Sequence, residues 1–277
     1  MSPSLPVYFD DLGAPVHLPV RTSSEPPLRI VSLVPSLTEA IARSAPGTLV
    51  AATDWCTHPA GLDVVRIGGT KNPDVQAIGN LAPDLVIANA EENRAPDLDA
   101  LRALGLAVWV TDIRTVDGAL TSMHRLLSAL NALGATDLTW LEQARIEWDS
   151  APTVVPGARI SAVVPIWRRP WMHVGSDTYA GDVLRRLGVD NALADSPERY
   201  PKMAVADLPD VDLVVLPDEP YLFTEQDGPE AFSPTPCALV SGRLLTWYGP
   251  AMLGATGELI TALRAGLAKP PASPLLP

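Results

Sequence analysis

Residues 29–44 read RIVSLVPSLTEAIARS, and this stretch indicates the fold class. The compact apolar run at residues 29–34 predicts a strand that is buried on both faces. Ser36 and Glu39 have the spacing of a capping box, which predicts a helix that runs through Ser44. The stretch therefore predicts a strand, a turn and a helix in succession.

The same alternation continues along the chain, so we predict an α/β protein with largely parallel sheets. In the first half, the pattern predicts strands at residues 48–53, 84–89 and 107–111, and helices at 73–81, 94–104 and 116–133. In the second half, it predicts strands at 159–166, 212–217 and 244–248, and helices at 178–187 and 252–267. A turn at Asp11-Leu12-Gly13 predicts a short hairpin over residues 7–18.

This pattern divides the chain into four expected segments. They are an N-terminal hairpin and linker (1–27), an N-terminal α/β lobe (28–134), a connecting helix (135–151) and a C-terminal α/β lobe (152–277). We expect two Rossmann-like lobes with parallel sheets, joined by a single long helix, with the ligand cleft between the lobes. The ligand crevice of a parallel sheet lies beyond the carboxyl ends of its strands. The acidic loops at 90–94 and 218–221 are therefore expected to face this cleft.

Composition and charge exclude several classes of function. The chain has 277 residues with 20 basic and 32 acidic side chains, a formal net charge of −12. This charge repels nucleic acids and anionic membranes, so we expect neither as a partner. No run reaches about 18 apolar residues, so we expect no membrane span. The N-terminal residues lack a basic leader and an apolar segment, which predicts a cytoplasmic protein, or a periplasmic one if a leader was removed.

Several motifs spread over the chain resemble one family, the helical-backbone substrate-binding proteins of ABC importers. These motifs are Asp11-Leu12-Gly13, residues 27–39, Gly68-Gly69, Asn72-Pro73-Asp74, residues 83–86, residues 181–184, Leu187-Gly188 and Asn191-Ala192. The family binds cobalamin, iron chelates or haem. The cobalamin-binding branch is the most similar, because it places a tryptophan before the C-terminal helix, where this chain has Trp247-Tyr248-Gly249-Pro250.

The resemblance implies non-catalytic binding of a cobalamin-like corrinoid, with an iron-siderophore or haem as the alternative ligand. The ligand would be a small molecule, no separate cofactor is implied, and the protein is expected to be a monomer. An ABC permease is a candidate partner, although Gln76 and Ala204 stand near the positions where the family has acidic docking residues.

The candidate ligand-binding residues fall in predicted loops or at strand ends. They are Trp55, His58, Glu91, Glu92, Asn93, Arg94, Trp167, Arg168, Trp171, Glu219, Tyr221, Trp247 and Tyr248. Aromatic side chains can stack on a large flat ligand, and polar ones can bind its amides. Alternatively, each aromatic packs on its own lobe, and the carboxylates cap helices. Trp109, Trp140 and Trp148 are expected in the core instead.

Metal binding and catalysis find little support in the sequence. A closed metal site needs about four ligands, and His58 and His173 are not paired with further histidines, so we predict no metal site. Cys56 and His58 could form the centre of a hydrolase or transferase, which is the alternative from another class of function. No orienting acid or oxyanion turn accompanies them, so we predict no catalytic residue and do not expect an enzyme. Cys56 and Cys237 are expected to be free thiols.

Overall fold

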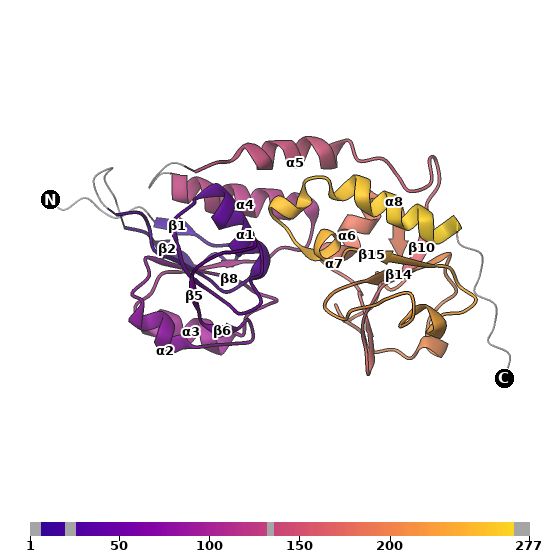
Figure 1. Ribbon diagram of the computed structural model, residues 1–277, viewed down its shortest axis with the longest axis horizontal. Coiled ribbons are helices and arrows are strands. Elements are labelled where there is room, and N and C mark those ends of the chain that lie inside the picture. The colour runs from indigo at the N-terminus through magenta and orange to yellow at the C-terminus, as the bar shows by residue number, and fades with distance from the viewer. Residues whose placement is uncertain (1–6, 20–25, 132–135, 269–277) are drawn as a thin grey trace. The chain divides into compact units, whose positions relative to one another are not determined.

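The computed structural model describes residues 7–19, 26–131 and 136–268. The chain forms two units (Figure 1). The first unit contains residues 1–113, 119–142 and 248–250, and the second contains residues 114–118, 143–247 and 251–277. Helices α4 (Val116–Asn131) and α5 (Thr139–Asp149) each have residues in both units. The expected domain boundaries and the cleft between lobes stay predictions.

Among its described residues, the first unit contains a five-stranded parallel sheet. The strand order is β5 (Val65–Arg66), β4 (Leu49–Ala52), β3 (Ile30–Ser32), β8 (Leu85–Asn89) and β9 (Val108–Thr111). All five residues of β8 are buried, as expected for a strand covered on both faces. Figure 1 shows α1 (Pro35–Ser44) and α4 on one side of this sheet and α2 (Val75–Asn80) and α3 (Ala95–Ala103) on the other.

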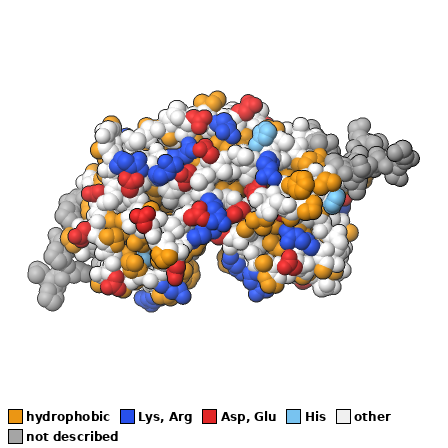
Figure 2. All heavy atoms as spheres, turned by 180° about the vertical axis from the view of Figure 1, so that it is seen from behind, with side chains coloured by type: hydrophobic (Ala, Val, Ile, Leu, Met, Phe, Trp, Pro, Cys, Tyr) orange, Lys and Arg blue, Asp and Glu red, His pale blue; other side chains and the backbone are white. Residues whose placement is uncertain are grey.

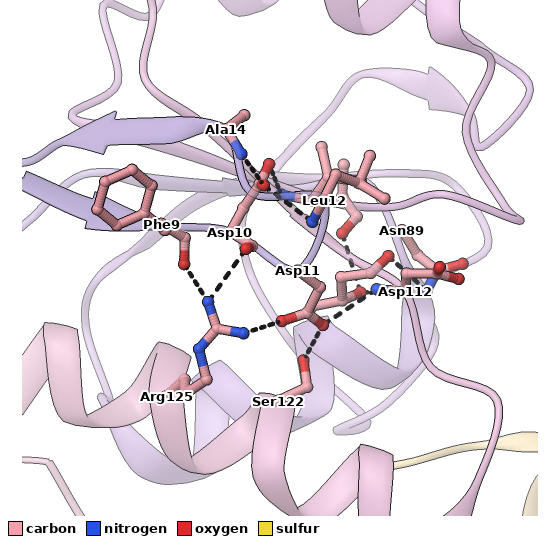
Figure 3. A network of polar contacts seen from close by, with 12 residues as sticks. Phe9, Asp10, Asp11, Leu12, Ala14, Asn89, Asp112, Ser122 and Arg125 are labelled. Carbon is pink, nitrogen blue, oxygen red and sulfur yellow. Dashed lines mark hydrogen bonds and ion pairs between the residues drawn. The ribbon is translucent and has the colours of Figure 1, made fainter.

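The predicted N-terminal hairpin is confirmed and is fixed to the first unit by two aspartates (Figure 3). Its strands are β1 (Val7–Phe9) and β2 (Pro15–His17). Asp10 is buried and closes the turn by accepting backbone hydrogen bonds. Asp11 accepts hydrogen bonds from the Asp112 amide at 3.0 Å and the Ser122 hydroxyl at 2.5 Å, and pairs with Arg125 at 3.0 Å. These contacts tie the hairpin to the end of β9 and to α4. A second small hairpin consists of β6 (Gly68–Gly69) and β7 (Asn72–Pro73).

The described part of the second unit contains a four-stranded parallel sheet. The strand order is β13 (Val189–Asn191), β10 (Ile160–Val163), β14 (Leu213–Pro217) and β15 (Cys237–Val240). A separate hairpin of β11 (Pro165–Arg168) and β12 (Trp171–His173) follows β10. The helices that lie wholly in this unit are α6 (Tyr179–Arg186), α7 (Gly242–Thr246) and α8 (Ala255–Ala268), with 3-10 turns η1 (Val205–Asp207) and η2 (Pro229–Ala231). A third 3-10 turn, η3 (Pro250–Met252), begins in the first unit and ends in the second.

The predicted fold class, α/β with two parallel sheets, is confirmed, but three local predictions are wrong. Helix α1 begins at Pro35, so Ser36 is not its cap, and no side chain caps it; proline suits the first helical position. The strand predicted at 159–166 is interrupted at Val164, and Pro165, which has no N–H to donate within a sheet, begins the next strand. The strand predicted at 244–248 is mostly helix α7, capped by Ser241, and the true strand β15 precedes it. The last two residues of the helix predicted at 116–133 lie outside the described residues.

Helix α5 carries one buried tryptophan for each unit. Trp140 is buried in the first unit, and its indole N–H donates to the Ser44 hydroxyl at 2.8 Å. Trp148 is buried in the second unit, and its indole N–H donates to the Met252 carbonyl at 3.1 Å. Both polar groups are therefore satisfied inside the core. The predicted core positions of Trp140 and Trp148 are confirmed, as is that of Trp109, which is 1% exposed.

Candidate ligand-binding site

The loop after β4 presents an exposed tryptophan on a fixed base. Trp55 is 67% exposed. Its indole nitrogen lies beside Gly69 in the small hairpin β6–β7; a Cβ atom added to Gly69 would lie 3.5 Å from that nitrogen. Arg66 donates hydrogen bonds of 2.9 Å to the carbonyls of Thr53 and Cys56, on either side of Trp55. The loop therefore holds a large apolar surface in water, the arrangement that a stacking ligand would use.

The thiol of Cys56 belongs to the packing of this loop. Cys56 is buried, and its sulfur lies 3.0 Å from the Thr38 hydroxyl and 3.1 Å from the Thr53 hydroxyl. His58 is half-buried, and its ring Nδ1 lies 3.2 Å from the Thr57 hydroxyl. A nucleophilic cysteine needs access to its substrate and a nearby base. A buried thiol held between two threonines gives the hydrolase or transferase alternative no support.

The loop after β8 is held together by two asparagines. The side-chain oxygen of Asn89 accepts hydrogen bonds from the amides of Glu91 and Glu92 at 2.9 and 3.2 Å. Asn93 is buried, and its side chain makes two hydrogen bonds of 2.9 Å. Its side-chain oxygen accepts from the backbone N–H of Asn89, and its side-chain nitrogen donates to the Thr70 carbonyl. Asn93 therefore has a structural role in the free protein.

The charged residues of the same loop lie nearer to solvent. Glu91 and Glu92 are half-buried. Lys71 from the small hairpin donates to the Glu91 carbonyl at 2.5 Å. Burial raises the pKa of Glu92, and the positive charge of Lys71 opposes that rise. Arg94 stands at the start of α3 and pairs with Asp97 at 2.9 Å.

Tyr248 belongs to the first unit and is buried there. Burial raises the pKa of its phenol, and the negative charge of Glu92 adds to the rise. The hydroxyls of Ser36 and Thr111, which can donate to the phenolate, lower this pKa and so oppose the rise. Tyr248 therefore lies among polar groups that follow β3 and end β9, and only a small part of it is accessible.

In the second unit, the hairpin β11–β12 carries two tryptophans with different surroundings. Trp167 is 43% exposed, and its ring meets that of Tyr221 edge to face, with ring centres 5.7 Å apart. Trp171 packs against the core cluster. Its ring is parallel to that of Phe223 at 6.1 Å and perpendicular to that of Phe232 at 5.1 Å. Trp167 can offer a large apolar surface to a ligand, whereas much of Trp171 is used for packing.

Arg168 is engaged by acidic side chains of the loop after β14. It forms ion pairs with Asp227 and Glu230. Its guanidinium also lies 5.5 Å from the centre of the Trp171 ring, within the range of a cation–π contact. Asp227 in turn accepts a hydrogen bond of 2.6 Å from the Tyr221 hydroxyl.

Glu219 and Trp247 meet beside helix α7. Burial raises the pKa of Glu219 and the neighbouring Asp218 adds to the rise, whereas a hydrogen bond with Trp247 and the charge of Arg243 oppose it. The Arg243 guanidinium lies 5.5 Å from the centre of the Trp247 ring. Gly242 leaves room for this cluster, because a side chain there would begin 2.5 Å from Glu219 Cγ.

His173 has a structural role. It is fully buried, and its Nε2 lies 3.1 Å from the Met203 carbonyl. Because a carbonyl only accepts, Nε2 carries the proton of the neutral ring. Burial lowers the pKa of His173, which favours this neutral form. Within the described parts of the chain, no group of three or more His, Cys, Asp or Glu side chains is placed to hold a metal ion.

The structure thus brings Trp167 together with Tyr221, Glu219 with Trp247, and Glu92 with Tyr248. Sequence reasoning missed Lys71, Arg243, Asp227 and Glu230, because no local motif marks them. Asp227 and Glu230 contact Arg168 about sixty residues away along the chain, whereas Arg243 contacts Trp247 at the end of its own helix. Basic and acidic side chains also lie next to one another on the face shown in Figure 2.

Known proteins share this fold. No family model matches the chain. The curated vitamin B12-binding protein of Vibrio cholerae serotype O1 (strain M66-2) is 27% identical over 188 residues, which are 65% of this chain and 66% of that protein. The crystal structure of the periplasmic vitamin B12 binding protein of Vibrio cholerae has a TM-score of 0.63 and 19% identity, covering 88% of this chain and 99% of that chain. The periplasmic heme-binding protein RhuT from Roseiflexus sp. RS-1 has a TM-score of 0.71 and 18% identity, covering 87% and 100%.

The chain has the fold of these binding proteins. The resemblance to helical-backbone substrate-binding proteins that the sequence motifs indicate is confirmed. The chain spans just under two thirds of the length of this curated relative. These relatives are named for a ligand that they bind and not for a reaction, which agrees with the expectation of binding without catalysis.

Where the protein resides is a separate question. The two solved structures are of proteins named as periplasmic. In the described residues, no helix combines the length and the apolar character that crossing a membrane requires. The cytoplasmic location expected from the N-terminal residues stays a prediction.

Proposed function

We propose that this chain is a substrate-binding protein that binds a cobalamin-like corrinoid and carries out no reaction on it. The observation that carries the proposal is the exposure of two tryptophans, Trp55 at 67% and Trp167 at 43%. Trp55 lies in the loop after β4, and Trp167 lies in the hairpin β11–β12 that follows β10; ligands of parallel sheets bind beyond these carboxyl ends of the strands. A large flat ring system gains from stacking on such side chains. The vitamin B12-binding relatives support the same ligand class.

Polar residues of the loops are proposed to bind the edge of the ligand. A corrin ring carries amide side chains that can donate to the carboxylates of Glu91, Glu92 and Glu219. Further proposed contacts come from His58, Arg94, Trp171, Tyr221 and Trp247. Asn93 and Tyr248 are buried in the free protein, so contact with them requires these groups to become accessible.

Charge favours a corrinoid over haem. Haem carries two propionate carboxylates, whereas the side chains of a corrin ring are mostly neutral amides. The cations near the candidate loops are already engaged: Lys71 by a carbonyl, Arg94 by Asp97, and Arg168 by two carboxylates. Binding an anionic ligand beside paired cations and half-buried glutamates costs electrostatic free energy. The heme-binding structures with the same fold keep haem as the second candidate.

Titration of the purified protein with cyanocobalamin tests the proposal. Corrin absorption overlaps tryptophan emission, so we expect quenching that saturates at one ligand per chain, with low-micromolar or tighter affinity. Haemin and a ferric siderophore serve as comparison ligands, and calorimetry checks each affinity. Tight binding of haemin without a response to cyanocobalamin would replace the first candidate with the second.

An ABC importer is the proposed partner, as for the family that the chain resembles. Gln76 and Ala204, near the positions where that family has acidic docking residues, are both exposed. Neutral side chains there would give up the charge-assisted contacts of acidic ones. We therefore expect weaker docking than with glutamate at both positions, which binding measurements on Gln76→Glu and Ala204→Glu with a cognate permease would check.

A further inference from the structure

The loop after β14 depends on the neighbouring hairpin for its position. Arg168, at the end of β11, forms ion pairs with Asp227 and Glu230, which stand six residues and nine residues after Tyr221. The side chain of Arg168 is 18% exposed, so these pairs are partly shielded from water. Removing the partners of a partly shielded charge is costly, because the remaining charge is then left uncompensated. Arg168 also lies over the Trp171 ring, which is anchored in the core.

The same loop supports the exposed tryptophan of the hairpin. Asp227 accepts a hydrogen bond from the Tyr221 hydroxyl at 2.6 Å. The Tyr221 ring packs on Phe223 at 4.7 Å and meets the edge of Trp167 at 5.7 Å. A continuous set of contacts thus runs from Arg168 through Asp227 and Tyr221 to Trp167.

We propose that Arg168 is a positioning residue: it orders the loop at 221–230 and so holds Tyr221 and Trp167 in place for the ligand, without contacting the ligand itself. This inference rests on the proposed function. The guanidinium of Arg168 faces two carboxylates, so the group of three has a net negative charge and offers little attraction to an anionic ligand. Arginine suits this role because its planar fork can donate to two carboxylates at once, which a lysine ammonium does less well.

Three variants separate positioning from direct contact. Arg168→Met removes the charge and keeps an apolar stem over Trp171. Asp227→Asn with Glu230→Gln removes the partners and leaves Arg168 intact. Arg168→Lys keeps the charge without the fork. Arg159→Met is the control, because Arg159 also forms an ion pair with an aspartate, Asp190, in the same unit but outside the candidate loops, and its side chain is 48% exposed.

We expect Arg168→Met and the double variant each to weaken cyanocobalamin binding by about tenfold, the effect of losing one ordered aromatic contact. Combining them should add little, because both break the same contacts. Arg168→Lys should recover part of the affinity, and Arg159→Met should bind like the wild type. If Arg168 contacts the ligand directly, the double variant keeps or improves its affinity, and the inference is wrong.

Hydrogen exchange of the ligand-free protein provides the second readout. Peptides that cover residues 218–232 should exchange faster in Arg168→Met than in the wild type or Arg159→Met, while thermal unfolding stays close to that of the wild type. Unchanged exchange in these peptides would overturn the inference even if affinity falls. A wild-type protein that binds neither cyanocobalamin nor haemin would refute the proposed function instead, and exchange would still report whether Arg168 orders the loop.

Discussion

Replacing Trp55 with alanine should weaken corrinoid binding strongly and change folding stability little. Trp55 is 67% exposed, so of the roughly 250 Å² that a tryptophan can bury, about 170 Å² is open to water. A flat ligand covers one face, about half of that area. At about 25 cal/mol per Å², covering about 80 Å² stabilises the complex by about 2 kcal/mol, or about 30-fold in Kd.

The assay is calorimetric titration of wild type and variants with cyanocobalamin, alongside thermal unfolding without ligand. Ile146→Ala is the matched control, because Ile146 is 69% exposed on α5 and lies outside the candidate loops. It should bind like the wild type, and Trp55→Phe should keep part of the affinity. The reasoning is refuted if Trp55→Ala binds as tightly as Ile146→Ala, since the exposed indole face would then not meet the ligand.

Three further predictions concern stability and pH. Gly266→Ala should lower the free energy of unfolding by about 1–3 kcal/mol in denaturant melts, because the new methyl would begin 2.4 Å from Ala238 Cβ. Burial lowers the pKa of His173. Its contribution to the free energy of unfolding is therefore complete above the unfolded-state pKa of about 6.5 and is lost as pH falls through the folded-state pKa. Acidification should then lower the melting temperature of His173→Gln less than that of the wild type. Burial raises the pKa of Glu219, so the protein loses stability as pH rises through the folded-state pKa of this carboxyl group. Glu219→Gln should therefore melt at a higher temperature than the wild type at pH 7, but not at pH 4.

Sequence patterns were sufficient to predict an element where its local conformational preference agrees with its surroundings in the fold. The strand at 85–89 is predicted correctly, because an uninterrupted apolar run has few alternatives. The helix after Pro35 is also predicted, but from a capping box at Ser36 that does not form; Pro35 occupies the first helical position instead. The run at 244–248 is wrongly read as a strand, because a short apolar segment fits either structure. Its helical form depends on Ser241, which caps α7, and on the buried environment of Leu244 and Leu245.

For the candidate site, too, the sequence determined some features and the tertiary structure decided others. From the alternation of strands and helices, the sequence predicts Trp55, Trp167 and Trp171 in loops or at strand ends. Trp55 does lie in the loop after β4, whereas Trp167 and Trp171 lie in β11 and β12, a hairpin that the sequence did not predict. Which of them remains exposed was decided only by the tertiary structure. Trp171 packs on Phe223 and Phe232, more than fifty residues away in sequence, whereas Trp55 has a glycine hairpin beside it and stays in water. Burial depends on contacts between distant segments, and residue type and spacing along the chain carry no record of those contacts.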